Sequence, residues 1–231
     1  MTAKAHERMA PDALSDLVNR MERMIVSGEW AAGAKLREVA LSESLGVGRG
    51  ALREAIRILE GKRLLERVPN AGVRVIAPTL DDFEQLLVTR EALEGMAARL
   101  AAENMTLAQV EQLSRAAHAL EAADHSQAHA WGVFEAGPDG DFHRQIAVGS
   151  RNQRLVQLLC DDLYPLLRFF RLRAAQVRPD ASVTHTEHRR IIAAIQHRDG
   201  DAAEQAMRAH VRRSRLTLLA HLRLAPPQPG P

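Results

Sequence analysis

The spacing of apolar positions predicts that most of the chain is helical. Between residues 12 and 28, apolar side chains recur every three or four positions, as they do in a helix that buries one face. The same spacing predicts shorter helices over 37–45 and 49–62, separated by a turn at Gly46. Two runs rich in β-branched residues then flank the turn-forming sequence Pro69-Asn70-Ala71-Gly72, which predicts a β-hairpin.

The rest of the chain is predicted to be entirely helical. A domain boundary is placed at Pro78, and six helices are expected over 80–104, 107–123, 127–148 with an interruption near Gly137-Pro138, 153–175, 183–197 and 201–224. Three pairs of residues fit a capping box, in which a polar side chain and a carboxylate or amide three positions later satisfy free backbone amides: Thr106 with Gln109, Thr184 with Glu187, and Asp201 with Glu204. The Pro-rich tail over 225–231 is predicted to be disordered.

Composition narrows the class of protein. The chain has 231 residues, of which 46% are hydrophobic and 26% charged, as is typical of a soluble protein with two modest domains. It contains neither an apolar run long enough to span a membrane nor the apolar segment of a secretory signal at its N-terminus. The single cysteine, Cys160, excludes an intrachain disulfide and a multi-cysteine metal site. We therefore expect a cytoplasmic protein with no membrane partner.

The distribution of charge is more informative than the net formal charge of +2. Residues 35–74 hold nine Lys or Arg against five Asp or Glu. Arg49, Arg53 and Arg57 recur every four positions on the third predicted helix, and such a stripe can contact phosphates and guanine edges in a DNA major groove. A solvated face is the alternative, but a helix, a turn, a second helix and a basic hairpin in this order favour DNA binding.

Residues 12–78 resemble the winged helix-turn-helix domain of the GntR superfamily of bacterial transcription regulators. The matching phrases are IVSGEWAAGAKL, LSESLGVGRGALREAIRILE and RVPNAGVRV. Gly48 departs from the Ser or Thr that is usual in the family, and Val39 replaces an arginine, for which the nearby Arg37 can substitute. With this resemblance, the predicted DNA-binding residues are Arg37, Gly48, Arg49, Gly50, Arg53, Arg57 and Gly72.

The second half of the chain contains residues typical of metal ligands. Asp139 and His143 lie four positions apart and would emerge on the same side of a helix, where they could form half of a metal site, a catalytic pair or a surface contact. His188 and His210 lie in two further amphipathic segments. Three imidazoles and one carboxylate suit a divalent first-row metal such as zinc, nickel or manganese.

Residues 79–224 resemble the FCD ligand-binding domain of FadR-type GntR regulators, which is an all-helical bundle. The matching phrases are LLVTREALEGMAARLAAE, DGDFHRQIAVGSRNQRL and EHRRIIAAIQHRDGDAAEQAMRAH. The resemblance implies a divalent metal ion, zinc first and nickel or manganese as alternatives, with the ligands Asp139, His143, His188 and His210. Arg90 and Asn152 are then predicted to bind a small carboxylate. The alternatives are an ion pair of Arg90 with Glu91 or Glu94, and a helix N-cap for Asn152.

These inferences define the expected fold and function. The fold class is mainly α, with an N-terminal winged helix-turn-helix and its hairpin wing over 1–78, and an antiparallel helical bundle that binds effector and metal over 79–224. We expect a homodimeric repressor that binds a palindromic operator in double-stranded DNA and is controlled by a small carboxylate at the metal site. The alternatives are a metal-dependent hydrolase or lyase that acts on small carboxylates, and a DNA-binding protein without an effector. Because no additional general base or nucleophile stands out near the site motifs, no enzymatic activity is expected.

Overall fold

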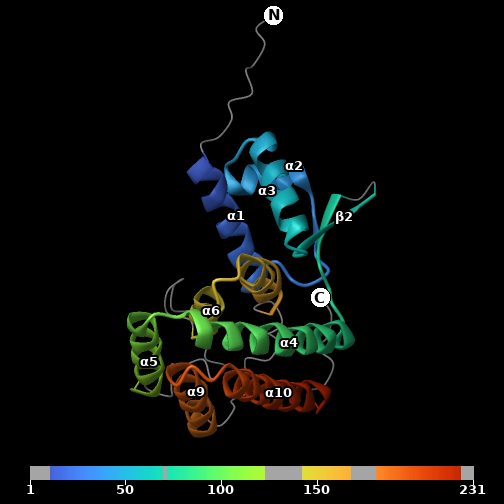
Figure 1. Cartoon of the computed structure of the whole chain (residues 1–231). Coiled ribbons are helices and arrows are strands. Elements are labelled where there is room, and N and C mark those ends of the chain that lie inside the picture. Colours follow the sequence, from blue (N-terminus) through green and yellow to red (C-terminus); the bar gives the residue numbers. More distant parts are fainter. Residues whose placement is uncertain (1–10, 70–71, 123–141, 168–180, 225–231) are drawn as a thin grey trace, which may run out of the picture. The chain divides into compact units, whose positions relative to one another are not determined.

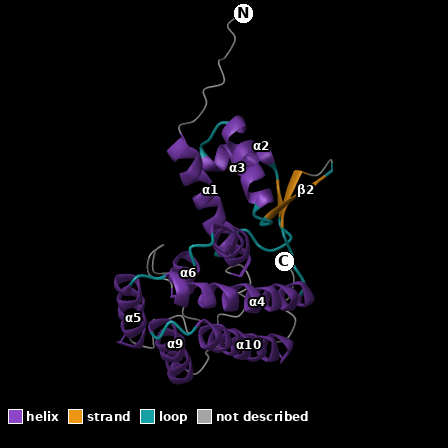
Figure 2. Cartoon of the chain, in the orientation of Figure 1, coloured by secondary structure: helices purple, strands orange, loops and turns teal. Residues whose placement is uncertain are grey.

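The structure is a computed structural model that describes residues 11–69, 72–122, 142–167 and 181–224. It divides into two compact units on either side of the bond between Pro78 and Thr79. Helices dominate both units, and the only strands among the described residues belong to the first unit (Figure 2). The predicted fold class, a winged helix-turn-helix followed by an all-helical domain, is confirmed.

The first unit contains three helices and a small antiparallel sheet with the strand order β1-β3-β2. Its elements are α1 (Pro11–Val26), β1 (Lys35–Leu36), α2 (Glu38–Leu45), α3 (Arg49–Gly61), β2 (Leu65–Val68) and β3 (Gly72–Val75). The predicted hairpin is formed by β2 and β3, paired from Leu65 with Val75 to Val68 with Gly72. Strand β1, which pairs Lys35 with Arg74, was not predicted, because two residues are too few to show an alternating pattern.

The core of the first unit lies between α1, α3 and the sheet. The fully buried side chains include Met21 and Ile25 from α1, Leu52, Ile56 and Leu59 from α3, and Val73 and Val75 from β3. Gly46 ends α2 in the left-handed conformation, with φ of 68°, and so makes the turn between the two helices. Gly72 is also left-handed at 87°, and a Cβ there would lie 2.9 Å from the carbonyl oxygen of Leu36, so only glycine fits where β3 begins.

The second unit is a bundle organised around its first helix, α4. Its elements are α4 (Leu80–Asn104), α5 (Leu107–Ala122), α6 (Phe142–Gly149), α7 (Gln153–Val156), the π-helix η1 (Gln157–Leu163), α9 (Ala181–Gln196) and α10 (Gly200–Leu224). Helices α4 and α10 lie side by side along most of their length, and α6 and α9 also pack on α4 (Figure 1). No described helix is long and apolar enough to cross a membrane.

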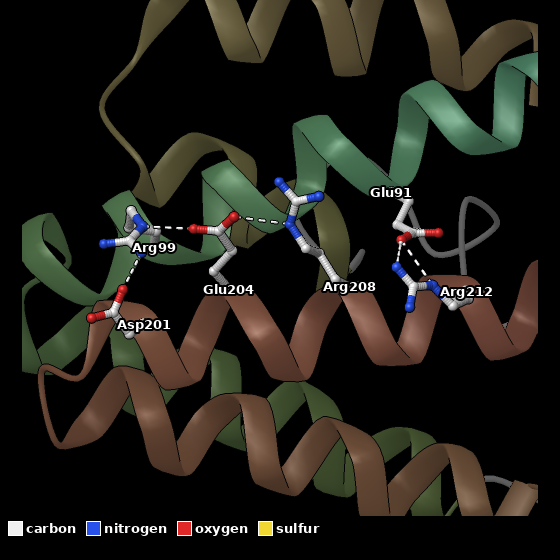
Figure 3. A network of polar contacts seen from close by, with 6 residues as sticks. All are labelled: Glu91, Arg99, Asp201, Glu204, Arg208 and Arg212. Atoms are coloured by element: carbon white, nitrogen blue, oxygen red, sulfur yellow. Dashed lines mark hydrogen bonds and ion pairs between the residues drawn. The ribbon is translucent and has the colours of Figure 1, made fainter.

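The contact between α4 and α10 carries a row of ion pairs along one side (Figure 3). Arg99 of α4 contacts both Asp201 and Glu204 of α10, and Glu204 also accepts a hydrogen bond from Arg208 at 2.8 Å. Arg208 passes directly over Gly95, where any Cβ would lie 2.7 Å from the Arg208 Cγ atom. The absence of a side chain at position 95 therefore allows α10 to lie close to α4 at this point.

One predicted helix, over 153–175, is not a uniform α-helix. Residues Gln157–Leu163 are a π-helix, and the backbone amide of Tyr164 hydrogen-bonds to the carbonyl of Leu159, five residues earlier. Pro165 follows directly and has no amide hydrogen with which to continue an α-helical ladder. This proline was the sequence signal for the irregularity. The N-terminal part of the predicted helix 127–148, the end of the helix 153–175 and the tail 225–231 lie outside the described residues.

Helix starts show which capping predictions were right. The predicted box at α5 is confirmed, because the Thr106 amide donates to Gln109 Oε1 at 2.9 Å and the Gln109 amide donates to Thr106 Oγ1 at 3.3 Å. A box that was not predicted caps α4, where the Thr79 amide donates to Asp82 Oδ2 at 2.8 Å and the Asp82 amide donates to Thr79 Oγ1 at 3.1 Å. It was missed because aspartate replaces the usual Glu or Gln.

The two other predicted boxes, Thr184 with Glu187 and Asp201 with Glu204, are wrong. Helix α9 begins about one turn before Thr184, and the Glu187 carboxylate is used elsewhere. Helix α10 is capped by Asp199, whose Oδ1 accepts a hydrogen bond from the Ala202 amide at 2.9 Å, so Asp201 already lies inside the first turn. The polar residue of the box was placed a few positions too late in both cases.

Candidate metal centre and nucleic-acid interface

Three histidines from three different helices meet inside the second unit. They are His143 on α6, His188 on α9 and His210 on α10, with exposed fractions of 3%, 2% and 5%. One ring nitrogen of each lies within 4.8 Å of those of the other two, and the ring centroids are 4.9 to 5.9 Å apart. The structure thus brings together three of the four predicted ligands. The fourth, Asp139, lies outside the described residues.

Burial keeps two of these imidazoles neutral near pH 7. It lowers the pKa of His188 well below its usual value, and the neighbouring rings act in the same direction. Burial also lowers the pKa of His210 to about 4, although its hydrogen bond to Glu187 opposes this shift. The contact of His210 with Glu187 is therefore a hydrogen bond from a neutral ring rather than an ion pair. The neutral imidazole is the form that binds a metal.

A buried carboxylate, Glu94 on α4, lies behind His143. Its Oε2 atom is 2.6 Å from His143 Nδ1, and its Oε1 atom accepts hydrogen bonds from Arg90 Nε at 2.6 Å and from the Tyr164 hydroxyl at 3.2 Å. Burial alone would raise the pKa of Glu94, but Arg90 and His143 outweigh it and hold that pKa well below its usual value. Arg90 thus forms an ion pair with Glu94, one of its two alternatives, although the pair is buried.

A second carboxylate, Glu187 on α9, lies behind His210. Its Oε2 atom is 2.8 Å from His210 Nδ1, and Arg213 on α10 donates to both of its oxygens, at 2.6 Å and 2.7 Å. Burial would raise the pKa of Glu187, but hydrogen bonds from His210 and Arg213 lower it below its usual value. His143 and His210 each contact a carboxylate through Nδ1, and each of these carboxylates is in turn bound by an arginine.

His188 is supported differently from the other two histidines. Its ring stacks on Phe142, with centroids 4.0 Å apart and planes 16° from parallel. Within the described residues, neither of its buried ring nitrogens has a hydrogen-bond partner. Buried polar atoms without a partner are costly and rare, and coordination of a metal ion would satisfy one of these nitrogens. Three imidazoles within reach of one point, two of them kept neutral by burial, fit a divalent first-row metal.

Asn152, a predicted effector-binding residue, caps helix α7. Its Oδ1 atom accepts hydrogen bonds from the backbone amides of Arg154 at 3.1 Å and Leu155 at 3.2 Å. This is the N-cap role that was the alternative for this residue. A role of Asn152 in binding an effector stays a prediction.

The predicted DNA-binding residues gather on one helix and its neighbours in the first unit. Arg49, Arg53 and Arg57 are exposed on α3, opposite the face that packs against α1. Gly48, the N-cap of α3, and Gly50 are exposed at the start of this helix. Arg37 is exposed immediately before α2, and Gly72 begins β3, next to the wing-tip residues 70–71 that lie outside the described residues.

Carboxylates interleave with these arginines. Glu38 on α2 accepts a hydrogen bond from Arg53 Nε at 2.9 Å and lies 3.4 Å from Arg67 on strand β2. Arg57 contacts Glu54 at 3.3 Å. The pKa of Glu38 is lowered below its usual value, chiefly by the hydrogen bond from Arg53, so Glu38 is negatively charged near neutral pH.

The sequence pattern missed Glu94, Glu187 and Tyr164 as parts of the histidine site. Glu94 was considered only as an ion-pair partner of Arg90, and Glu187 only as a helix cap. The available signal was a charged residue on an otherwise apolar helical face, since Glu94 lies one turn before Ala98 on the buried side of α4. Such a residue must find a buried partner, but the sequence alone does not say which one.

Comparison with known proteins identifies both units. Residues 14–75 match the family of bacterial regulatory proteins called the gntR family, and residues 85–213 match the FCD domain. The Glc operon transcriptional activator of Escherichia coli (strain K12) is 31% identical over 212 residues, which cover 83% of each chain. The HTH-type transcriptional repressor NanR of Enterobacter sp. (strain 638) is 30% identical over 229 residues and covers 88% of this chain and 84% of its own. The structure of E. coli McbR/YncC aligns with a TM-score of 0.66 at 19% identity, over 93% of this chain and all of that one, which shows a shared fold.

Proposed function

The chain belongs to the GntR family of bacterial transcription regulators and carries an FCD domain, and on this basis we propose that a small carboxylate controls its binding to DNA through a metal site in the second unit. The observation that carries the proposal is the convergence of His143, His188 and His210, three buried imidazoles with one ring nitrogen each within 4.8 Å of the others. A regulator that senses nothing has no need for such a costly buried arrangement.

The first unit, residues 1–78, is proposed to bind an operator in double-stranded DNA through α3. Arg49, Arg53 and Arg57 project from its exposed face, and Gly48 and Gly50 leave the amides at its N-terminus accessible to a phosphate. One such helix reads only a few base pairs. We therefore propose a homodimer on a palindromic operator, in which two half-sites together supply the affinity.

The second unit, residues 79–224, is proposed to bind a divalent metal ion, zinc in the first place and nickel or manganese as alternatives. His143, His188 and His210 would hold it together with Asp139. A bound divalent cation supplies open coordination positions and a concentrated positive charge, both of which attract a small carboxylate. Arg90 is proposed to assist through its positive charge, and Asn152 is a further proposed contact.

Control of DNA binding requires that the effector favours one conformation over another, because only a difference in affinity shifts an equilibrium. Helix α4 is suited to this role. It begins at Leu80, directly after the boundary between the units, and it also carries Arg90 and Glu94 at the histidine site. The two named relatives are an activator and a repressor. We propose a repressor that leaves its operator when the carboxylate binds.

The experiment that tests this function is a thermal-shift screen of small mono- and dicarboxylates on zinc-loaded and chelator-stripped protein. A ligand that binds only the folded state raises the melting temperature according to its saturation. We expect one acid to stabilise the zinc-loaded protein and to have no effect after chelation, and we expect the same acid to release a bound operator.

His210→Ala should abolish both effects, whereas His118→Ala, on the exposed face of α5, should retain them. Stabilisation by acids regardless of zinc would exclude the metal from recognition, and turnover of the acid would indicate an enzyme.

A further inference from the structure

Two of the three histidines in the site share one structural device. His143 Nδ1 lies 2.6 Å from Glu94 Oε2, and His210 Nδ1 lies 2.8 Å from Glu187 Oε2. The two carboxylates come from different helices, α4 and α9, and neither is adjacent in sequence to the histidine that it contacts. The same carboxylate–histidine contact therefore occurs twice in this site.

Each carboxylate is itself fixed in place. Glu94 is held on its other oxygen by Arg90 and by the Tyr164 hydroxyl, and Glu187 is held on both oxygens by Arg213. An ionised carboxylate can only accept hydrogen bonds, so the Nδ1 atom that faces it must carry the proton. In a neutral imidazole the other nitrogen, Nε2, then holds the lone pair that a metal requires.

We propose that Glu94 and Glu187 are positioning residues of the metal site, each of which fixes the Nδ1-protonated tautomer of its histidine and presents Nε2 to the shared point. This inference rests on the proposed function. Carboxylates in this position orient a ligating imidazole and increase its basicity. His188 has no such partner within the described residues and is oriented by its stacking on Phe142.

Glu91 provides a matched control on the same helix. It is buried like Glu94, with exposed fractions of 6% and 2%, but its Oε1 atom accepts hydrogen bonds from Arg212 of α10 at 3.0 Å and 2.6 Å (Figure 3). Glu91→Gln therefore removes a buried carboxylate from α4 that binds arginines of α10 rather than a histidine of the site. Any loss that is caused by a buried charge alone will appear in this variant too.

The test compares wild type, Glu94→Gln, Glu187→Gln and Glu91→Gln as full-length proteins. Zinc affinity is measured by competition with a chromophoric chelator, and histidine tautomers are read from ring nitrogen chemical shifts in the metal-free proteins. We expect zinc binding to weaken by about 10- to 100-fold in Glu94→Gln and Glu187→Gln, and to stay unchanged in Glu91→Gln. A glutamine can donate as well as accept, so the second tautomer should appear at His143 in the first variant and at His210 in the second.

The possible outcomes distinguish a failure of the positioning role from a failure of the metal site itself. If wild type binds zinc and both glutamine variants match its affinity and tautomers, the positioning role is overturned and the metal site stands. If wild type does not bind zinc, the metal part of the proposed function fails. Should Glu94→Gln fail to fold, Tyr164→Phe removes one anchor of Glu94 and keeps the ring. We expect zinc binding to weaken less in Tyr164→Phe than in Glu94→Gln. An unchanged zinc affinity in Tyr164→Phe would count against a positioning role of Glu94.

Discussion

At the scale of single residues, two of the arginines predicted to bind DNA, Arg53 and Arg57, contact carboxylates on their own surface. Glu38 lies between Arg53 and Arg67, and the Arg53 side chain is 63% exposed. An exposed ion pair of this kind contributes little to folding stability, because water and salt screen it. If Arg53 binds DNA as predicted, this carboxylate would orient its guanidinium and offset part of its charge.

Glu38→Gln should bind random-sequence duplex DNA more tightly than wild type, by several-fold. The substitution removes a negative charge that would approach the phosphates, so the slope of log affinity against log salt should also steepen by about one. Fluorescence anisotropy over a series of KCl concentrations measures both quantities. Glu43→Gln, an exposed change on the same helix, is the control, and an equal response of the two variants would refute the role of Glu38.

Arg49→Ala should weaken operator binding by about 1–3 kcal/mol, the range for loss of a side chain that contacts a base edge. Arg49 lies in the first turn of α3, is exposed and has no ion pair among the described residues. Arg63→Ala, an exposed arginine beyond the end of α3, should change operator affinity much less. If binding to operator and to random DNA falls by the same factor in Arg49→Ala, this residue contacts phosphate rather than a base.

The sequence predicted the residues whose role shows in the surrounding sequence. It did not predict the residues whose role depends on partners far along the chain. His143, His188 and His210 were predicted as ligands from phrases around each residue, and the fold brings them together. The partners Glu94 and Glu187 come from distant parts of the chain, and His143 lies 49 positions after Glu94. A hydrogen bond across that distance is decided by helix packing, which periodicity does not specify.

At the scale of elements, the long helices were predicted well and the short irregular ones were not. The predicted helix over 80–104 matches α4 at both ends, because the existence of a long helix is what a sequence indicates best. Strand β1 and the π-helix η1 were missed. Both are defined by hydrogen bonds that leave little trace in the apolar spacing, and in η1 the proline at position 165 was the remaining signal.

Thr79→Ala should lower the stability of the helical unit by about 1 kcal/mol, the usual cost of losing an N-cap side chain. Thr79 caps α4 through a reciprocal box with Asp82. The hydrogen bonds from Thr79 also lower the pKa of Asp82, so the stabilisation by this carboxylate is present above its usual pKa and is lost as the pH falls through the lowered one. Thr79→Ala should therefore also reduce the loss of stability on acidification.

Thermal unfolding of Thr79→Ala from neutral to acidic pH, followed by circular dichroism, measures both effects. Thr89→Ala removes a hydroxyl from the exposed middle of the same helix, where Oγ1 donates a hydrogen bond to the carbonyl of Gln85. This control should keep the acid sensitivity of wild type. A similar pH profile for Thr79→Ala and wild type would show that the box does not stabilise α4.

At the scale of the whole molecule, a unit with exposed arginines and a unit with buried charged residues are joined by a short connection. Only residues 76–79 separate the end of β3 from the start of α4. The first unit carries its charge on the surface of α3, whereas the second unit carries charge in its interior, on Arg90, Glu91 and Glu94. Under the proposed control by a carboxylate, α4 is the element of the second unit that begins closest along the chain to the first unit.

An operator cut to a single half-site should bind at least 100-fold more weakly than the full palindrome. The reason is that two α3 helices of a dimer contribute jointly, and the second contact costs little once the first has formed. Anisotropy titrations with duplexes of equal length and one scrambled half-site measure this ratio, and light scattering of the free protein measures its mass. Equal binding to both duplexes would contradict a symmetric dimer on the operator.

The burial of the three histidines affects how fast an ion could enter or leave the site. With at most 5% of each residue exposed, an ion held by His143, His188 and His210 could enter or leave only when the helices around it open locally. An acid that binds an open coordination position of that ion would have to reach the same buried point and would need the same openings. The rate at which the helices open, rather than diffusion through solvent, would then limit how fast both the ion and the acid exchange.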